Sequence, residues 1–381
     1  MDISFDYSFK GILAVPGRAL KPKKIIAASF FILVAFGLYE LFFYLATLIA
    51  DRDPVSYCAI FGLIAVPDFG PGFYVAVAVY FIGLALAVMA VMTGMMAVSI
   101  IDFEELRGNP FLSYGQAIGF ALKRIRQLFL SELAIILFVL AIVVLGLLVG
   151  LIGRIPVIGE WLYSVFFFFP NFVVAILTVF IIFVAVLSVL IMPATVAADR
   201  HGESFNSILE TFLTVTRQPG RWLGYTVYAV LSAKVCSFIL AYFAWRAVQF
   251  LEWSTALGAG AKAHAMIASG AMHLPLTSAP VEFTNNIFPG INFGFDISNL
   301  ASGGIESTAG YVMTAALFLI FVIIWGYILS VIATGQAFSY AVIKKLRDDY
   351  TIDTEQSLFY EEEYINPPID DSDQTENDQP T

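Results

Sequence analysis

The stretch that decides the fold is residues 132–153, ELAIILFVLAIVVLGLLVGLIG. A helix needs about 20 apolar residues to cross a hydrocarbon core roughly 30 Å thick, and this stretch is long enough. Five further long apolar runs lie at 25–50, 72–101, 171–196, 222–250 and 311–335. A membrane β-barrel would instead show short segments of alternating hydrophobicity. The sequence therefore predicts an all-α, polytopic transmembrane helix bundle with six spans.

The composition supports a membrane protein. Of the 381 residues 59% are hydrophobic and only 13% are charged, and the mean hydropathy is +0.84. Residues 1–24 lack the early apolar core of a cleaved signal peptide, so we expect the first run to remain as a span. Only two cysteines occur, and no Cys/His cluster has the spacing of a zinc site, so we expect neither a structural disulfide nor a metal.

The positions of Lys and Arg predict the orientation, because cytoplasmic loops retain positive charge. Four basic residues flank the spans on one side, and Lys234 lies within a span. The fifteen on the other side are Lys10, Arg18, Lys21, Lys23, Lys24, Arg107, Lys123, Arg124, Arg126, Arg200, Arg217, Arg221, Lys344, Lys345 and Arg347. We therefore expect both termini in the cytoplasm. The absence of Asn-x-Ser/Thr sequons is compatible with a bacterial inner membrane.

The connections on the basic side carry a repeated pattern. From Ser113 to Phe129 apolar residues recur at helical spacing, and Lys, Arg and Gln occupy most of the remaining arc, which predicts an amphipathic interfacial helix. Residues 204–218 align with 113–127 without a gap, and residues 336–347 resemble 116–126 with one insertion. We expect three helical hairpins, each entered from an amphipathic segment, as parallel internal repeats. Similar composition of short apolar-basic segments is the alternative explanation.

These amphipathic segments supply candidate lipid contacts. Basic side chains near the membrane surface attract anionic headgroups, by about 1 kcal/mol each. The candidates are Lys123, Arg124, Arg126, Arg217 and Arg221. We therefore expect membrane lipids as partners, with other membrane proteins as further possible partners, and no nucleic acid.

The predicted organisation has four parts. Residues 1–102 hold an N-terminal segment and hairpin 1, and residues 103–200 hold an amphipathic helix and hairpin 2. Residues 201–347 hold an amphipathic helix and hairpin 3, with an outer loop at 252–310 that is expected to start as a short surface helix. Twelve of the 30 acidic residues lie in residues 348–378, and residues 348–381 are therefore predicted to be a disordered acidic tail.

Two charged residues fall inside predicted spans. A charge near the bilayer centre costs about 2.5–3.5 kcal/mol on insertion scales, which makes Lys234 an anomaly and Glu40 its best partner. A Glu40–Lys234 intramembrane pair would bind a substrate or relay protons. The alternative is a purely structural role, as an interior pair or with Lys234 extending along a cavity.

Residues 146–150, GLLVG, form a GxxxG motif in the third span. Gly146 and Gly150 would allow another helix to approach closely. Packing within the chain is the first expectation, and homodimerisation is the alternative.

No catalytic or cofactor-binding motif is recognisable, so we expect no cofactor. Asp102, Glu104 and Glu105 cluster beside Arg107 at the end of the second span, where paired carboxylates would suit a divalent metal. A solvated Glu-Arg turn is the simpler interpretation, and no residue is assigned a catalytic role.

Short motifs in residues 100–240 resemble a polytopic bacterial membrane-domain family related to the membrane portion of glycerophosphodiester phosphodiesterases. They are Met192-Pro193 at a span end, Ala198-Asp199-Arg200, and Ser204 followed by Ser207-Ile208-Leu209. The resemblance implies an architecture only, because that membrane portion has no established catalytic residues and the soluble phosphodiesterase barrel has no counterpart here.

The sequence thus favours a non-enzymatic integral inner-membrane protein that acts as a scaffold or as a subunit organising lipids or partners. A transporter or permease that uses the Glu40–Lys234 element is the alternative. A membrane enzyme acting on lipids, with Asp102, Glu104 and Glu105 at its site, is the second alternative.

Overall fold

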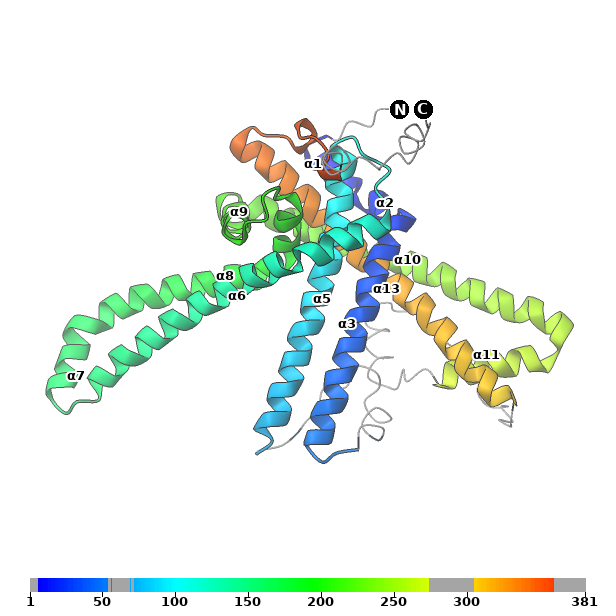
Figure 1. Ribbon diagram of the computed structural model, residues 1–381, viewed down its shortest axis with the longest axis horizontal. Helices are drawn as coiled ribbons and strands as arrows, with labels where there is room; N and C mark the ends of the chain where they lie inside the picture. Colours follow the sequence, from blue (N-terminus) through cyan, green and yellow to red (C-terminus); the bar gives the residue numbers. More distant parts are fainter. Residues whose placement is uncertain (1–5, 54–55, 57–68, 70–71, 274–304, 360–381) are drawn as a thin grey trace, which may run out of the picture.

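A computed structural model describes residues 6–53, 56, 69, 72–273 and 305–359, and every regular element within them is helical. Six long helices dominate (Figure 1). They are α3 (Pro22–Ile49), α5 (Tyr74–Leu106), α6 (Tyr114–Gly153), α8 (Phe168–Ala198), α10 (Pro219–Ala259) and α13 (Ile305–Asp348). The shorter elements are α1 (Phe9–Leu13), α2 (Val15–Ala19), α7 (Ile158–Leu162), the π-helical turn η1 (Tyr163–Phe167), α9 (Ser204–Arg217), α11 (Ala261–His273) and the 3₁₀ turn η3 (Ile352–Thr354).

The six long helices coincide with the six predicted spans, and each is long and apolar enough to cross a membrane. The prediction of an all-α polytopic bundle is therefore confirmed, and the chain is a multi-pass membrane protein. Helices suit this environment because all their backbone hydrogen bonds are made within one segment.

The long helices form three arms that diverge from one common end (Figure 1). Arm 1 is the α3–α5 hairpin, arm 2 is the α6–α8 hairpin closed by α7 and η1, and arm 3 contains α10, α11 and α13. The largest buried cluster lies where the arms meet and draws on all three, with Phe103 from α5, Met192 from α8, and Trp222 and Tyr340 from arm 3. We call this meeting point the hub.

Helix α13 is the central element, because it packs against α3, α5, α8 and α10. Small residues allow this approach. A Cβ atom added to Gly326 would lie 2.0 Å from the Ser29 Oγ of α3, and one added to Gly335 would lie 2.5 Å from the Ala229 Cβ of α10.

Local sequence signals explain where the helices begin. Ser113 caps α6 in a capping box with Gln116. Pro22 and Pro219 stand at the first helical positions of α3 and α10, where a missing N–H costs nothing. Pro219 also restricts the backbone of the residue before it, so α9 ends there and α10 begins as a separate helix. No proline directly follows residue 129, and α6 continues from its amphipathic part into its span as one helix.

The three segments with the repeated pattern all reach the hub. Ala117 and Ala121 from the first, Val215 from the second and Ala337 and Ala341 from the third belong to the same buried cluster. True internal repetition remains a prediction.

The outer loop and the tail both contain ordered segments. The outer loop includes the helix α11, as expected, and α11 packs against α13, where Gly270 lies against Met313. Residues 274–304 lie outside the described residues. The tail does not lose structure at residue 348, because residues 349–359 return to the hub and include the buried Ile352. Residues 360–381 lie outside the described part of the chain.

Replacing Gly326 with leucine should separate α3 from α13, because the new side chain would also meet the Ser29 backbone nitrogen at 3.0 Å, which cannot move aside. Overpacking of this kind costs about 1–3 kcal/mol. We expect G326L to lower the midpoint of thermal unfolding in detergent. The matched control is G146L, since a Cβ at Gly146 meets nothing within 4 Å. Equal midpoints for the two variants would contradict this packing.

Candidate functional site

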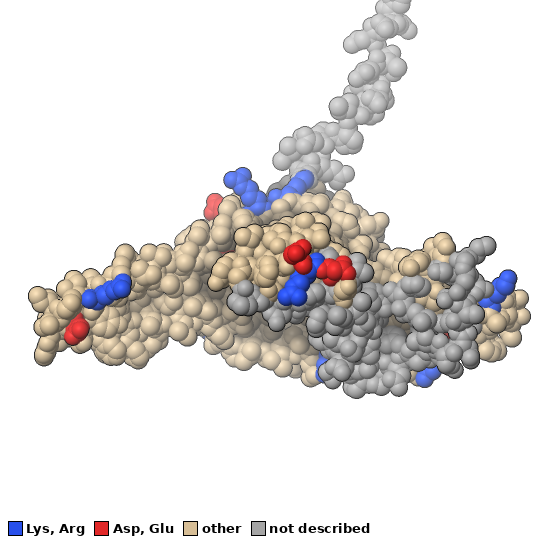
Figure 2. Space-filling model, turned by 90° about the horizontal axis from the view of Figure 1, so that it is seen from below, with Lys and Arg blue, Asp and Glu red and all other residues tan. Residues whose placement is uncertain are grey.

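Charged side chains gather at the hub rather than along the arms. Seen from the opposite end of the arms, the described surface is mostly uncharged (Figure 2). Two ion networks, one further group of polar contacts and one polar cavity are found at the hub, and each brings together residues that are distant in the sequence.

The first network joins α3 to α5. Lys24 Nζ lies 2.6 Å from Asp102 Oδ1 and 3.1 Å from Glu105 Oε2, and the side chains of Lys24 and Asp102 are both fully buried. Lys21 and Lys23 each approach Glu105 to 2.8 Å from the more exposed side. Burial of an isolated lysine would be very unfavourable, so the two carboxylates are what allow Lys24 to lie inside.

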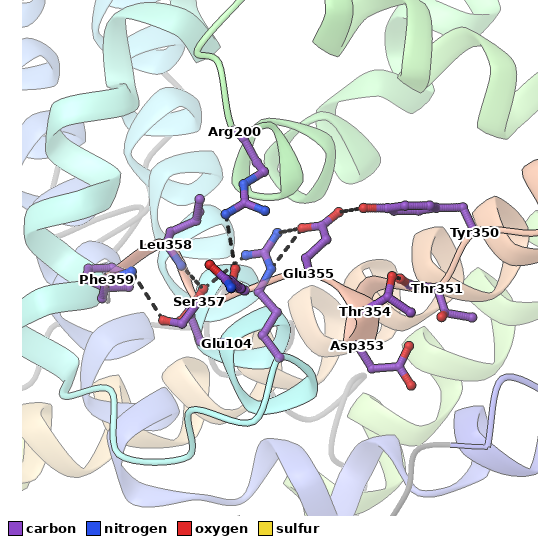
Figure 3. Close-up of polar contacts among 12 residues, drawn as sticks. Glu104, Arg200, Tyr350, Thr351, Asp353, Thr354, Glu355, Ser357, Leu358 and Phe359 are labelled. Atoms are coloured by element: carbon purple, nitrogen blue, oxygen red, sulfur yellow. Dashed lines mark hydrogen bonds and ion pairs between the residues drawn. The ribbon is translucent and has the colours of Figure 1, made fainter. Parts of the chain in front are cut away.

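The second network holds the C-terminal segment against α5 (Figure 3). The buried Glu104 carboxylate accepts hydrogen bonds from Arg107 (3.1 Å), the Ser357 hydroxyl and the Leu358 backbone N–H (3.2 Å). Arg107 also donates to Glu355, through Nε at 3.0 Å. We call residues 349–359, which carry these partners, the C-terminal clasp.

Further contacts hold the clasp together and attach it to the N-terminal segment and to α6. The Tyr350 hydroxyl donates to Glu355 Oε1 at 2.7 Å, and burial together with this carboxylate raises the pKa of Tyr350. The Tyr7 hydroxyl donates to Asp353 at 3.1 Å, which brings the two ends of the described chain together at the hub. Phe359 packs near Phe120 of α6.

These networks change the interpretation of Asp102, Glu104 and Glu105. A solvated turn was the simpler expectation, but Asp102 and Glu104 are fully buried, and all three carboxylates are paired with basic side chains. Among the described residues, no group of three His, Cys, Asp or Glu side chains is arranged to hold a metal ion. The cluster therefore joins structural elements.

A third group of polar contacts connects arm 2 to α9. Asp199 follows α8 and accepts hydrogen bonds from Gln127 of α6 (2.7 Å), from Asn206 (3.0 Å) and from the Glu203 N–H (2.8 Å). Gln127 also donates to Ser207 at 2.9 Å. The buried Asp199 therefore fixes the turn between α8 and α9 against the first part of α6.

A polar cavity of about 140 Å³ lies beside this turn. Its lining residues are Thr195, Ala198, Asp199, Arg200, His201, Asn206, Glu210, Tyr340, Lys344 and Glu355. At about 30 Å³ per water it has room for a few waters or a small polar ion. Glu210 in its wall is already bound by Arg347 at 2.8 Å, and Lys344 Nζ lies over the Tyr340 and Tyr350 rings.

The predicted Glu40–Lys234 pair does not form. Lys234 is exposed on α10, Glu40 is half-buried on α3, and no ion pair between described residues includes either one. The physical reason is that α3, which carries Glu40, and α10, which carries Lys234, each pack against α13 rather than against one another. Glu40 Oε1 is buried without a hydrogen-bond partner among the described residues.

The five predicted headgroup-binding residues divide into two groups. Lys123, Arg126, Arg217 and Arg221 are exposed and keep that predicted role. Arg124 instead points into the protein and donates to the Arg200 carbonyl and to Gln127 Oε1, both at 3.0 Å. Gly202, at φ +78°, makes room for it, because a Cβ there would lie 2.3 Å from the guanidinium.

The GxxxG motif packs against none of the residues that the structure describes. A Cβ added to Gly146 or Gly150 would meet nothing within 4 Å, so the expected contact within the chain is not made by any of these residues. These glycines lie on the exposed outer part of α6, which leaves intermolecular packing as the remaining hypothesis.

Sequence reasoning missed three features of this region. Lys24 was one of several flanking lysines, and only its burial distinguishes it. The clasp was assigned to the tail because of its acidic composition. Glu132, within α6, accepts a hydrogen bond from Ser188 of α8 at 3.0 Å, and its position at the start of an apolar run was the available signal.

Comparisons with protein-family models, with curated proteins and with solved structures find no match for this chain. The resemblance to the membrane portion of glycerophosphodiester phosphodiesterases therefore remains a prediction.

Replacing Lys24 with methionine should strongly destabilise the hub, because it leaves buried carboxylates without their main cation. Loss of one partner of a buried pair costs about 3–5 kcal/mol. We expect K24M to lower the thermal midpoint and K24M/D102L to recover part of the loss. K234M is the matched control, since Lys234 is exposed. A loss in K24M no larger than in K234M would contradict the role of this pair.

Replacing Ser357 with aspartate should release the clasp, because a second carboxylate would face Glu104 in a buried site. Hydrogen exchange of the backbone amides in residues 350–359 measures this release, and we expect at least tenfold faster exchange. Q356D serves as the control, because Gln356 is exposed. Equal protection in S357D and the unmodified protein would show that the clasp does not depend on Glu104.

Proposed function

We propose that this integral membrane protein is a non-enzymatic scaffold that organises lipids or partner membrane proteins around its three arms. The observation that carries the proposal is the contrast between the hub and the arms. The buried charged groups of the hub are paired with one another, whereas long apolar faces of the arms are left exposed by the described residues.

Arm 2 supports this proposal most directly. Along the outer parts of α6 and α8 nearly every large apolar side chain is exposed, including Leu145 (61%) and Val179 (66%). Lipid tails can cover such faces, and small residues such as Gly146 and Gly150 would let a partner helix approach closely. The hub would hold the three arms in a fixed relation.

The orientation proposal is that the hub faces the cytoplasm in a bacterial inner membrane. Most of the fifteen basic residues of the positive side belong to the hub elements, and the Tyr7–Asp353 contact puts both ends of the described chain there. The exposed Lys123, Arg126, Arg217 and Arg221 would then meet the anionic headgroups of the cytoplasmic leaflet.

A transporter is the second candidate, and Glu40 is the observation that favours it. A carboxyl group inside an apolar helix is a functional-site hypothesis by default. Its buried Oε1, which has no hydrogen-bond partner among the described residues, would be available to a proton or a cation. The exposed position of Lys234 argues against the original form of this hypothesis, in which the two residues act together.

Gentle purification from native membranes into nanodiscs, with mass spectrometry of co-purifying proteins and lipids, tests the scaffold. We expect a stoichiometric membrane-protein partner or an enriched lipid. E40Q provides the discriminating variant. Unchanged thermal stability together with a lost growth or uptake phenotype in E40Q would contradict the scaffold and support transport.

A further inference from the structure

An apolar groove lies between α3 of arm 1 and α13 of arm 3. It has a volume of about 460 Å³. The α3 side is lined by Pro22, Ile25, Ile26, Ser29, Phe30 and Leu33, and the α13 side is lined by Leu319, Val322 and Ile323.

The shape of the groove follows from how the two helices meet. Gly326 allows α13 to touch α3 at Ser29, whose hydroxyl donates to the Val322 carbonyl at 3.4 Å. One turn beyond Leu33, Phe36 of α3 and Phe318 of α13 are in contact, with ring centroids 5.1 Å apart. Ile26 and Ile323 stay about half-exposed on opposite sides (both 48%).

The length of the groove matches one leaflet. Pro22 and Leu33 are eleven residues apart, which at 1.5 Å per residue is about 16 Å along α3. The hydrocarbon core is roughly 30 Å thick, so each leaflet contributes about 15 Å. An acyl chain entering from the hub side would therefore run the length of the groove and stop near the Phe36–Phe318 contact.

The hub end of the groove carries positive charge. Three lysines, Lys21, Lys23 and Lys24, face two carboxylates, Asp102 and Glu105, which leaves an excess of one positive charge. Lys21 is the most exposed of the three, with 46% of its side chain accessible. No side chain caps the start of α3, so the positive end of its helix dipole adds to this charge.

From this juxtaposition we propose that the α3–α13 groove is a binding site for one anionic phospholipid, with an acyl chain between the helices and the phosphate at Lys21. This site is separate from the amphipathic segments and does not depend on the scaffold role, because its argument rests on the groove and the lysines alone. Anionic lipid bound there would join arm 1 to arm 3.

Native mass spectrometry of the full chain, titrated with phosphatidylglycerol or phosphatidylcholine of the same acyl chains, tests the site. We expect one phosphatidylglycerol to bind preferentially, and K21Q to weaken that binding about fivefold, as for the loss of one surface cation. K10Q is the charge control, because Lys10 is exposed on α1 away from the groove.

I323W should fill the groove and remove the bound lipid. I182W is its control, since Ile182 is similarly exposed on α8 (43%).

Each outcome decides the proposal. Loss of the single lipid in I323W but not in I182W, with both variants folded by thermal unfolding, supports it; L319W provides a second filling variant. Equal binding of phosphatidylglycerol and phosphatidylcholine would show that the groove contacts bulk lipid without selecting an anionic headgroup, and would overturn the proposal. A dimer that disappears in I323W would assign the groove to a second copy and also overturn it.

Discussion

The buried Lys24–Asp102 pair is the interaction on which the rest of the structure depends. Both side chains are fully buried, and their nitrogen and oxygen lie 2.6 Å apart. Neither charge could stay in this position without the other, so α3 and α5 have one register at the hub. Once that register is set, Glu104, two residues after Asp102, faces the C-terminal segment and Glu105 faces the remaining lysines.

The same constraint explains why polarity and apolar surface are divided so sharply along the molecule. Charged groups are stable inside the protein only as hydrogen-bonded pairs, and such pairs need several elements in one place. The hub supplies those elements from all three arms, from the N-terminal helices and from the clasp. The outer parts of arm 1 and arm 2 each consist of only two long helices, and most of their exposed side chains are accordingly apolar.

This division also bears on function. Carboxylates that look catalytic in the sequence are engaged in holding helices together, so the surfaces left for interaction are the apolar faces and the exposed basic residues. A lipid or a partner helix satisfies both kinds of surface. The α3–α13 groove, with lysines at one end and apolar walls along its length, combines them in one place.

The sequence by itself determined the fold class, the six spans and the sign of the charge at each end of the spans. Hydropathy and flanking charge are local properties of the sequence, and insertion into the bilayer depends directly on them. It also marked Asp102, Glu104 and Glu105 as a cluster. Only the tertiary structure decided which charges meet. Lys24 and Asp102 are 78 residues apart, and Glu104 and Leu358 are 254 apart. For the same reason the Glu40–Lys234 pair and the inward GxxxG contact could not be judged from spacing, since both depend on where α13 and α6 lie relative to their neighbours.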